Sequence, residues 1–316
     1  MGGIHTERLR ALDGVRISGV YDINNDAAKT LADNAQTRAY NDLDVLLNAE
    51  KPDAVYICLP PFAHNGEAEK CARYGAALFL EKPLALTVNR AESICDAVSE
   101  AGVISLMGYH QRYGGAVKKL KDMIDDGTAG KPCLFDARYA CKGFDPPWWR
   151  DISKSGGQVL EQVSHTYDMA SYLFGEPVSV MGMMANIAHK QFDSYTIEDV
   201  SASVARFTNE SIMSISATNC AVPMRWDNPF YVVCENLTAN FEDPNHAEFI
   251  YTNDIEVHCE NLSFENDLYA TENEYFVECL RSNTETFCPV SEGLNSFRFV
   301  MAVIESARKS KQINLK

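Results

Sequence analysis

The stretch DAVYICLPPFAHNGEAEKCARYGAALFLEKPLALTVNRAESICDAVSEAGVISLMG (residues 53–108) decides the fold, because short apolar runs and helical stretches alternate in it. The run DAVYICLP (Asp53–Pro60) is continuously apolar and ends in prolines, which is typical of a buried parallel strand. The next predicted helix ends at Gly75, and the one after it begins at the capping residue Thr87 and ends at Gly102. This alternation predicts a parallel sheet with helices on both faces.

The residues before this stretch extend the same pattern toward the N-terminus. VRISGVYD (Val15–Asp22) predicts a strand, and the opening MGGIHTERLRAL resembles the end of a glycine-rich turn that runs into its helix. Gly2 and Gly3 would then be the last glycines of a dinucleotide-binding fingerprint, and Asp22 stands where an acid binds the ribose hydroxyls. Ile23 follows, with no arginine nearby to bind a 2′-phosphate, so NAD is favoured over NADP. The alternative is that the glycines are a loose terminus and Asp22 a turn residue.

A dinucleotide fold also needs a strand before the glycine turn, and that strand lies in the middle of the sheet. The sequence has none, so we expect a doubly wound (Rossmann) sheet that lacks its first strand and leaves two rows of backbone groups unpaired. We infer that the chain is a fragment or that an internal methionine has been taken as the start. Weak NAD binding is expected, because Gly2 and Gly3 would belong to a free terminus.

The second part of the chain has a different pattern of apolar and polar residues. We assign residues 1–108 to the dinucleotide-binding domain and residues 109–316 to an α+β domain with a mainly antiparallel sheet, because runs between residues 178 and 258 alternate and are joined by polar turns. One continuous helix is expected over residues 159–174. Further helices are expected at residues 115–125, 272–280 and 291–309.

Composition excludes several classes of function. The 316 residues carry a formal charge of −16, which repels nucleic acid, and no apolar run is long enough to span a bilayer. The N-terminus lacks the pattern of a signal peptide, so a cytoplasmic protein is expected. The ten cysteines are scattered without a CxxC pair, which favours reduced, buried thiols over a disulfide framework.

Three motifs resemble a known family. They are CLPPFAH (Cys58–His64), LEKPLALT (Leu80–Thr87) and SGGQVLEQVSHTYDMASYLFG (Ser155–Gly175), and they are similar to motifs of the Gfo/Idh/MocA oxidoreductases. The resemblance implies an NAD domain followed by a substrate domain, with the active site in the cleft between them. It also implies reversible hydride transfer to or from a ring hydroxyl of a sugar, inositol or sugar derivative, and assembly into homodimers or homotetramers.

The resemblance implies three catalytic residues. Lys82, just past the end of a predicted parallel strand, matches the lysine that contacts substrate and nicotinamide. His165 matches the active-site histidine, and Glu161 occupies a position that is usually aspartate. Glu161, His165 and Asp168 are spaced to share one face of a helix. The alternatives are a solvated lysine paired with Glu81 and a solvent-facing polar stripe.

Further site residues are expected around these three. The Lys82–Pro83 peptide is expected to be cis, and the glycine pair before Gln158 to let the backbone approach a ligand. Besides the glycines and Asp22, the residues expected to bind the cofactor are Pro60, His64, Glu81 and Lys82. Those expected to bind substrate are Tyr109, Arg112, Trp148, Trp149, Arg150 and Asp168. Alternatively, His64 caps a helix, Asp168 orients His165, and the tryptophans are core residues.

No metal is predicted, because the remaining histidines, His5, His189, His246 and His258, lack ligand spacing. Two other functions stay open. One is an NAD-using enzyme of the same fold that cleaves glycosidic bonds, which would retain its NAD. The other is a catalytically inactive sugar- or NAD-binding protein, favoured by the incomplete fingerprint but not by intact Lys82 and His165.

Overall fold

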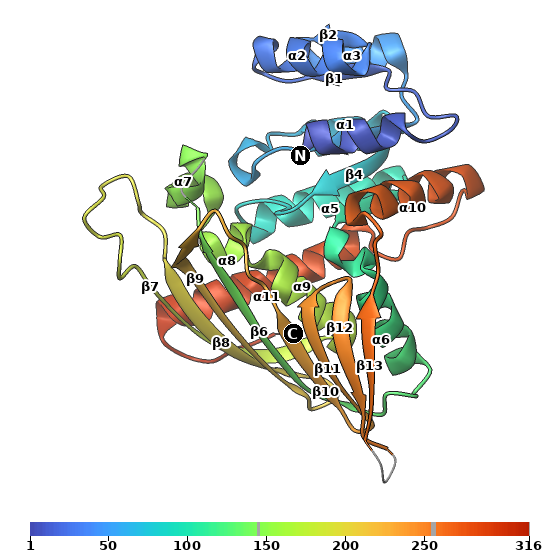
Figure 1. Ribbon diagram of the computed structural model, residues 1–316. Helices are drawn as coiled ribbons and strands as arrows, with labels where there is room; N and C mark the ends of the chain where they lie inside the picture. Colours follow the sequence, from blue (N-terminus) through green and yellow to red (C-terminus); the bar gives the residue numbers. More distant parts are fainter. Residues whose placement is uncertain (144–145, 254–256, 316) are drawn as a thin grey trace. The chain divides into compact units, whose positions relative to one another are not determined.

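The computed structural model describes residues 1–143, 146–253 and 257–315 and divides into two units (Figure 1). The first unit is Met1–Gly108 with Asp267–Leu294, and the second is Tyr109–Asn266 with Asn295–Lys316. Residues 267–294 were expected in the second domain. They join the first unit because helix α10 (Leu268–Ser282) packs on helix α1 and sets Phe276 5.8 Å from Phe79, between ring centroids.

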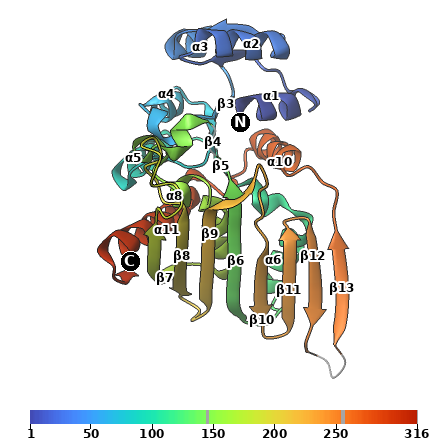
Figure 2. The same ribbon diagram turned by 60° about the vertical axis from the view of Figure 1, so that its left-hand side comes forward.

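The first unit is built from parallel strands and helices in alternation, as predicted. Its strands form two separate parallel sheets with the orders β1-β2 and β3-β4-β5 (Figures 1 and 2). No strand in the described part of the chain joins them. The strands are β1 (Gly19–Tyr21), β2 (Arg38–Tyr40), β3 (Ala54–Ile57), β4 (Ala77–Glu81) and β5 (Ser105–Gly108). The other helices are α1 (Gly2–Arg10), α2 (Asn25–Ala35), α3 (Leu43–Glu50), the 3₁₀ turn η1 (Pro61–Ala63), α4 (Glu67–Arg73) and α5 (Val88–Ala101).

Local sequence explains the ends of these elements. The side chain of Thr87 accepts a hydrogen bond from the Arg90 amide at the start of α5, and Gly102 ends that helix in the left-handed conformation. Every residue of β4 is buried, as expected for a strand covered on both faces. The end of β4 therefore lies at a fixed place in the unit.

The second unit is a mixed sheet of nine strands in the order β13-β12-β11-β10-β6-β9-β8-β7-β14 (Figure 2). Among the described strands of this sheet only β6 and β9 are parallel neighbours, so the sheet is mainly antiparallel, as predicted. The strands are β6 (Pro132–Lys142), β7 (Pro177–Ala185), β8 (Val200–Phe207), β9 (Ile212–Pro223), β10 (Phe230–Cys234), β11 (Leu237–Asp243), β12 (His246–Tyr251), β13 (His258–Ser263) and β14 (Ile313–Asn314).

Helices cover one face of this sheet. α9 packs on β6 and β9, α6 packs on β12 and β13, and Ser306 of α11 accepts a hydrogen bond from the amide of Gly182 in β7. The helical segments are η2 (His110–Tyr113), α6 (Gly115–Asp125), η3 (Pro147–Arg150), α7 (Ile152–Ser155), α8 (Gln158–Glu161), α9 (Ser164–Phe174) and α11 (Val290–Lys309), which begins in the first unit. None of the described helices is both long and apolar enough to cross a bilayer.

One predicted element is wrong. The helix expected over residues 159–174 is two helices, α8 and α9, with a break at Gln162 and Val163. The amides of both break residues donate to the carbonyl of Gln158, which closes the last turn of α8 instead of continuing it. Glu161 and His165 therefore lie on different helices, not on one face of one helix.

Candidate functional site

The candidate cofactor residues lie at the start of α1 and after β1. Gly2 and Gly3 are the first residues of α1, which has no side-chain cap and no acidic residue in its first turn. The first amides of a helix have no partner inside it and attract anions. Asp22 is half-buried after β1 and accepts the Asn24 amide at 2.8 Å, and Ile23 beside it is exposed. An uncapped helix start and an acid after the next strand fit a dinucleotide.

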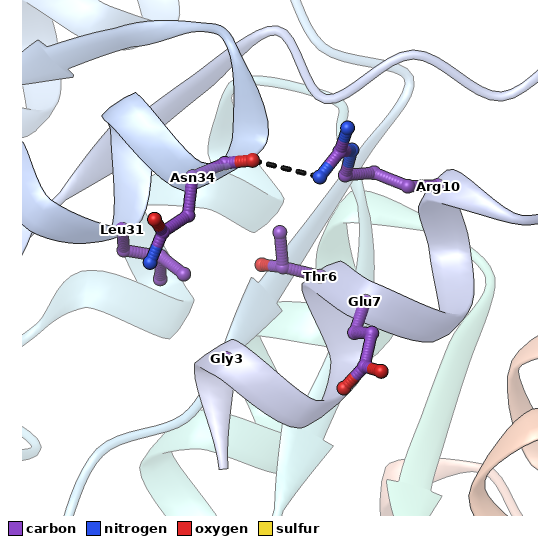
Figure 3. A pocket seen from close by; sticks show the side chains of 6 residues that line it. All are labelled: Gly3, Thr6, Glu7, Arg10, Leu31 and Asn34. Atoms are coloured by element: carbon purple, nitrogen blue, oxygen red, sulfur yellow. Dashed lines mark hydrogen bonds between the residues drawn. The ribbon is translucent and has the colours of Figure 1, made fainter.

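A hollow lies against the same helix. It has a volume of about 250 Å³ and is formed by α1 and α2 (Figure 3), with Gly3, Thr6, Glu7, Arg10, Leu31 and Asn34 as its lining. Arg10 closes one side by donating to the carbonyl of Asn34 at 2.7 Å. Among the candidate cofactor residues only Gly3 borders it, so the hollow is not assigned to the cofactor.

The EKP motif lies at the end of β4, as the sequence predicted. The Lys82–Pro83 peptide is cis, which confirms that prediction. Glu81 is buried, and its Oε1 lies 2.8 Å from Nε2 of His5 in α1. Asn273 of α10 donates to the other ring nitrogen of His5 at 3.0 Å. Glu81 therefore fixes β4 to α1 through His5, and His5 in turn contacts α10 through Asn273.

His64 is buried, and neither ring nitrogen has a hydrogen-bond partner in the described structure. Burial lowers the pKa of its imidazole, so the ring is neutral near neutral pH. It does not cap α4, because the N-cap of that helix is Gly66. Pro60 precedes η1 and is half-buried. A neutral ring with unused polar atoms is a reasonable binding group for a polar ligand.

An aromatic cluster surrounds His165 in the second unit. His165 in the first turn of α9 is 9% exposed, and its ring centroid lies 5.8 Å from that of Tyr109 and 4.5 Å from that of His110. Glu161, at the end of α8, is buried as well. The structure thus places His165 in the core of the second unit, not on a solvent-facing stripe.

Arg112 and Asp168 form a buried, bidentate ion pair. The guanidinium donates to the carboxylate at 2.8 and 2.6 Å, and Ser296 donates to Asp168 at 2.7 Å. The pair joins η2, which follows Tyr109, to the α9 helix of His165. In the described structure these two side chains bind each other. This contact favours the alternative that Asp168 orients His165, and it argues against direct binding of substrate by Arg112 and Asp168.

The Pro/Trp loop contributes half-buried side chains. Trp148, Trp149 and Arg150 form η3, and Arg150 has its Nε buried with no hydrogen-bond partner among the described residues. The backbone carbonyl of Arg150 accepts the Thr196 amide at 2.9 Å, which fixes the turn. Phe144 and Asp145 of this loop lie outside the described residues.

Three possible metal ligands come together elsewhere in the second unit: His189, Asp199 and Cys220. The carboxylate of Asp199 already accepts the amides of Ile187, Ala188 and His189, and the ring of His189 lies 2.9 Å from it. These contacts explain the cluster as the anchor of the loop after β7.

Three residues that contact the candidate site residues were not predicted from the sequence: His5, His110 and Glu198. His5 carries a weak signal, because it shares the buried side of α1 with Leu9, one helical turn on. For His110 the sequence gives no signal beyond its place in GYHQRY. Glu198, whose carboxylate accepts the Val159 amide at 2.7 Å, is distant in sequence from its partner and carries no signal.

Comparison with known proteins adds independent findings. Residues 1–109 match the model "Oxidoreductase family, NAD-binding Rossmann fold", and residues 117–240 match the "GFO/IDH/MocA C-terminal domain". Myo-inositol 2-dehydrogenase of Thermotoga maritima is 31% identical over 179 residues, which cover 56% of this chain and 53% of that protein. Inositol 2-dehydrogenase of Rhizobium meliloti is 26% identical over 334 residues, covering 100% of this chain and 96% of that protein.

A solved structure supports the fold alone. Levoglucosan dehydrogenase in complex with NADH and levoglucosan superposes with a TM-score of 0.91 at 18% identity, and the match covers 100% of this chain and 96% of that one.

Proposed function

The chain belongs to the Gfo/Idh/MocA oxidoreductase family, and from that premise we propose that it transfers a hydride between NAD and a ring hydroxyl or ketone of a sugar, an inositol or a sugar derivative. The observation that carries the proposal is the place of Lys82. It directly follows the fully buried strand β4 of the NAD-binding domain, and open α/β sheets bind their ligands at the carboxyl ends of such strands.

The chemistry needs a base as well as a hydride acceptor. NAD would be held by Gly2, Gly3 and Asp22 and would supply the hydride acceptor. Lys82 and His165 accept the hydroxyl proton and steady the developing charge on oxygen, with Glu161 assisting. The products are a ketone, NADH and a proton, so atoms and charge balance.

The remaining candidates fall into two groups. Gly2, Gly3 and Asp22 hold the pyrophosphate and ribose, with Pro60 and His64 beside them. NAD is preferred over NADP, because a 2′-phosphate would face the carboxylate of Asp22. Substrate is bound by Tyr109, Trp148, Trp149 and Arg150, because aromatic rings suit the apolar face of a sugar and a guanidinium suits its hydroxyls.

A substrate panel tests this proposal. The protein is mixed with inositols, hexoses and anhydrosugars, each with NAD and with NADP at saturating concentration, and NADH formation is followed by absorbance. We expect turnover with at least one cyclic polyol or sugar and a preference for NAD. Absence of turnover in both directions, while bound NAD is detected by fluorescence, would refute the proposal. Release of a leaving group without net NADH would favour glycoside cleavage.

A further inference from the structure

The turn before Gln158 closes on a side chain of the chain itself. Gly157 has φ 107° and ψ 166°, a backbone conformation that is nearly restricted to glycine. A Cβ at this position would lie 2.5 Å from Oε2 of Glu198. The glycine pair is expected to let the backbone approach a ligand, but the group next to Gly157 in this structure is the Glu198 carboxylate.

Glu198 also holds the helix that follows the turn. It lies two residues before β8 and is 6% exposed. Its Oε1 accepts the amide of Val159 at 2.7 Å. Val159 is in the first turn of α8, where amides have no partner within the helix. One carboxylate therefore fixes both the glycine turn and the start of α8.

This arrangement has an electrostatic cost. Burial raises the pKa of Glu198 to about 7, against hydrogen bonds from backbone amides and the charge of Arg308, which lower it. In the described part of the chain Glu198 forms no salt bridge. A buried carboxylate without an ion partner is destabilising, so its contacts with the backbone turn are what this residue provides.

The fixed turn leads directly to the candidate catalytic residues. Glu161 is the last residue of α8, which has only four residues, and His165 lies in the first turn of α9. We propose that Glu198 is a positioning residue that sets the places of Glu161 and His165 by holding Gly157 and Val159. The role in turnover rests on the proposed function, whereas the effect on the turn does not.

The neighbouring residue provides a matched comparison. Asp199 holds a different loop, because its carboxylate accepts the amides of Ile187 and Ala188 at 2.7 and 2.8 Å. Loss of Glu198 should loosen the turn at residues 156–165, and loss of Asp199 should loosen the loop at residues 186–189. Each variant is thus the control for the other.

Hydrogen–deuterium exchange tests the positioning role without any substrate. In Glu198→Ala we expect faster exchange at residues 157–165, with residues 186–189 and strand β9 unchanged. In Asp199→Ala the order is reversed. Unchanged exchange at residues 157–165 in Glu198→Ala would overturn the proposal. If the alanine variant fails to fold, Glu198→Met takes its place, because it removes both acceptor oxygens and nearly keeps the side-chain volume; the expected region and the overturning result are the same.

Kinetics then test the consequence for the reaction. Misplacement of reacting groups by about 1 Å can cost about 100-fold in rate, so Glu198→Ala should lower kcat by about that factor. Its affinity for NAD should stay within about twofold of the wild type, because the candidate cofactor residues lie in the first unit. Glu198→Gln keeps an acceptor oxygen for Val159 and should recover part of kcat. The exposed Glu176→Gln should match the wild type.

The two proposals fail in different ways. A wild-type kcat in a folded Glu198→Ala would overturn the positioning role, as would equal losses of kcat and NAD affinity. Failure of the wild type itself to turn over any substrate would refute the proposed function, and the exchange comparison would still decide the role of Glu198.

Discussion

A buried guanidinium–carboxylate pair, Arg112 with Asp168, joins the helix of His165 to the η2 turn. Both side chains are almost fully buried, and Ser296 and the ring of Tyr172 complete the surroundings of the pair. Taking two charges out of water is costly, so such a pair stabilises a structure only while both partners are present. The pair orients two elements, because it joins the η2 turn after Tyr109 to the α9 helix that carries His165.

The first prediction at this scale concerns that pair. Asp168→Asn leaves Arg112 buried without an opposite charge and should lower the free energy of unfolding by about 3 kcal/mol. Urea denaturation measures the change. Glu305→Gln breaks an exposed ion pair with Lys309 and should cost less than about 1 kcal/mol. Equal, small changes in the free energy of unfolding for the two substitutions would show that the buried pair contributes no more to stability than the exposed pair does.

The second prediction concerns catalysis. Lys82→Ala and His165→Ala should each lower kcat by about 10²–10⁴-fold, because each removes a group that handles the hydroxyl proton. Circular dichroism and thermal unfolding check that the variants stay folded. Lys131→Ala, which removes a half-exposed lysine, should leave kcat unchanged. Near-normal turnover in a folded Lys82→Ala or His165→Ala would remove that residue from the mechanism.

Residue types were easier to predict than their partners. The motifs identified Lys82, Glu81, Arg112 and Asp168 as important, but the partner of Glu81 lies 76 residues away and that of Arg112 lies 56 residues away. A single sequence contains no information about which distant side chains meet. For this reason Glu81 was expected at the cofactor, whereas its carboxylate contacts His5.

At the scale of elements, periodicity was a good guide where an element is buried by its neighbours. The strands β3, β4 and β5 lie within the apolar runs that predicted them, and every residue of β4 and β5 is buried, as expected for strands covered on both faces. The break between α8 and α9 could not be predicted in the same way. Residues 158–174 have a helical pattern throughout, and the turn before them is fixed by Glu198, a tertiary contact that propensity does not include.

The third prediction follows from the pKa of Glu198, which is about 7 in the folded protein against an ordinary value of 4.5. The folded state binds the proton of the Glu198 carboxyl more tightly than the unfolded state does, so the ionised carboxylate is destabilising. The free energy of unfolding therefore falls as the pH rises from about 4.5 to about 7. At 1.36 kcal/mol per unit, the loss is about 3 kcal/mol. The other ionisable groups that face Glu198 are Tyr167, Tyr195 and Arg308, and burial raises the pKa of both tyrosines further above this window.

Urea denaturation at a series of pH values measures this effect. Glu198→Gln has no proton to lose, so its stability relative to the wild type should rise across the same window and then stay constant. Glu176→Gln removes an exposed carboxylate elsewhere in the same unit and is the control; its curve should follow that of the wild type between pH 5 and 7. Parallel curves for the wild type and Glu198→Gln would contradict the prediction.

At the scale of the whole molecule, the surface combines a strongly acidic charge of −16 with one apolar sheet face. On the face of the second-unit sheet opposite its helices, large apolar side chains are exposed on the neighbouring strands β7, β8 and β9: Met181 and Met183 of β7, Val204 of β8 and Ile212 of β9. Tyr231 of β10 is also exposed, beyond strand β6. Their inward neighbours, such as Val232 and Cys234, are buried. Contiguous apolar patches of this kind on soluble proteins usually mark an interaction surface.

The last prediction is that this sheet face joins copies of the chain into a homodimer or homotetramer. Met181 and Val204 lie directly opposite each other on β7 and β8, so two lysines there place like charges side by side among the exposed apolar side chains. The double variant Met181→Lys/Val204→Lys should reduce the molar mass measured by light scattering at micromolar concentration to that of a monomer. Val45→Lys adds a lysine at an exposed apolar site on α3 of the first unit and should leave the assembly intact. A wild-type monomer would contradict self-association, and an oligomer that survives the double variant would place the interface on another surface.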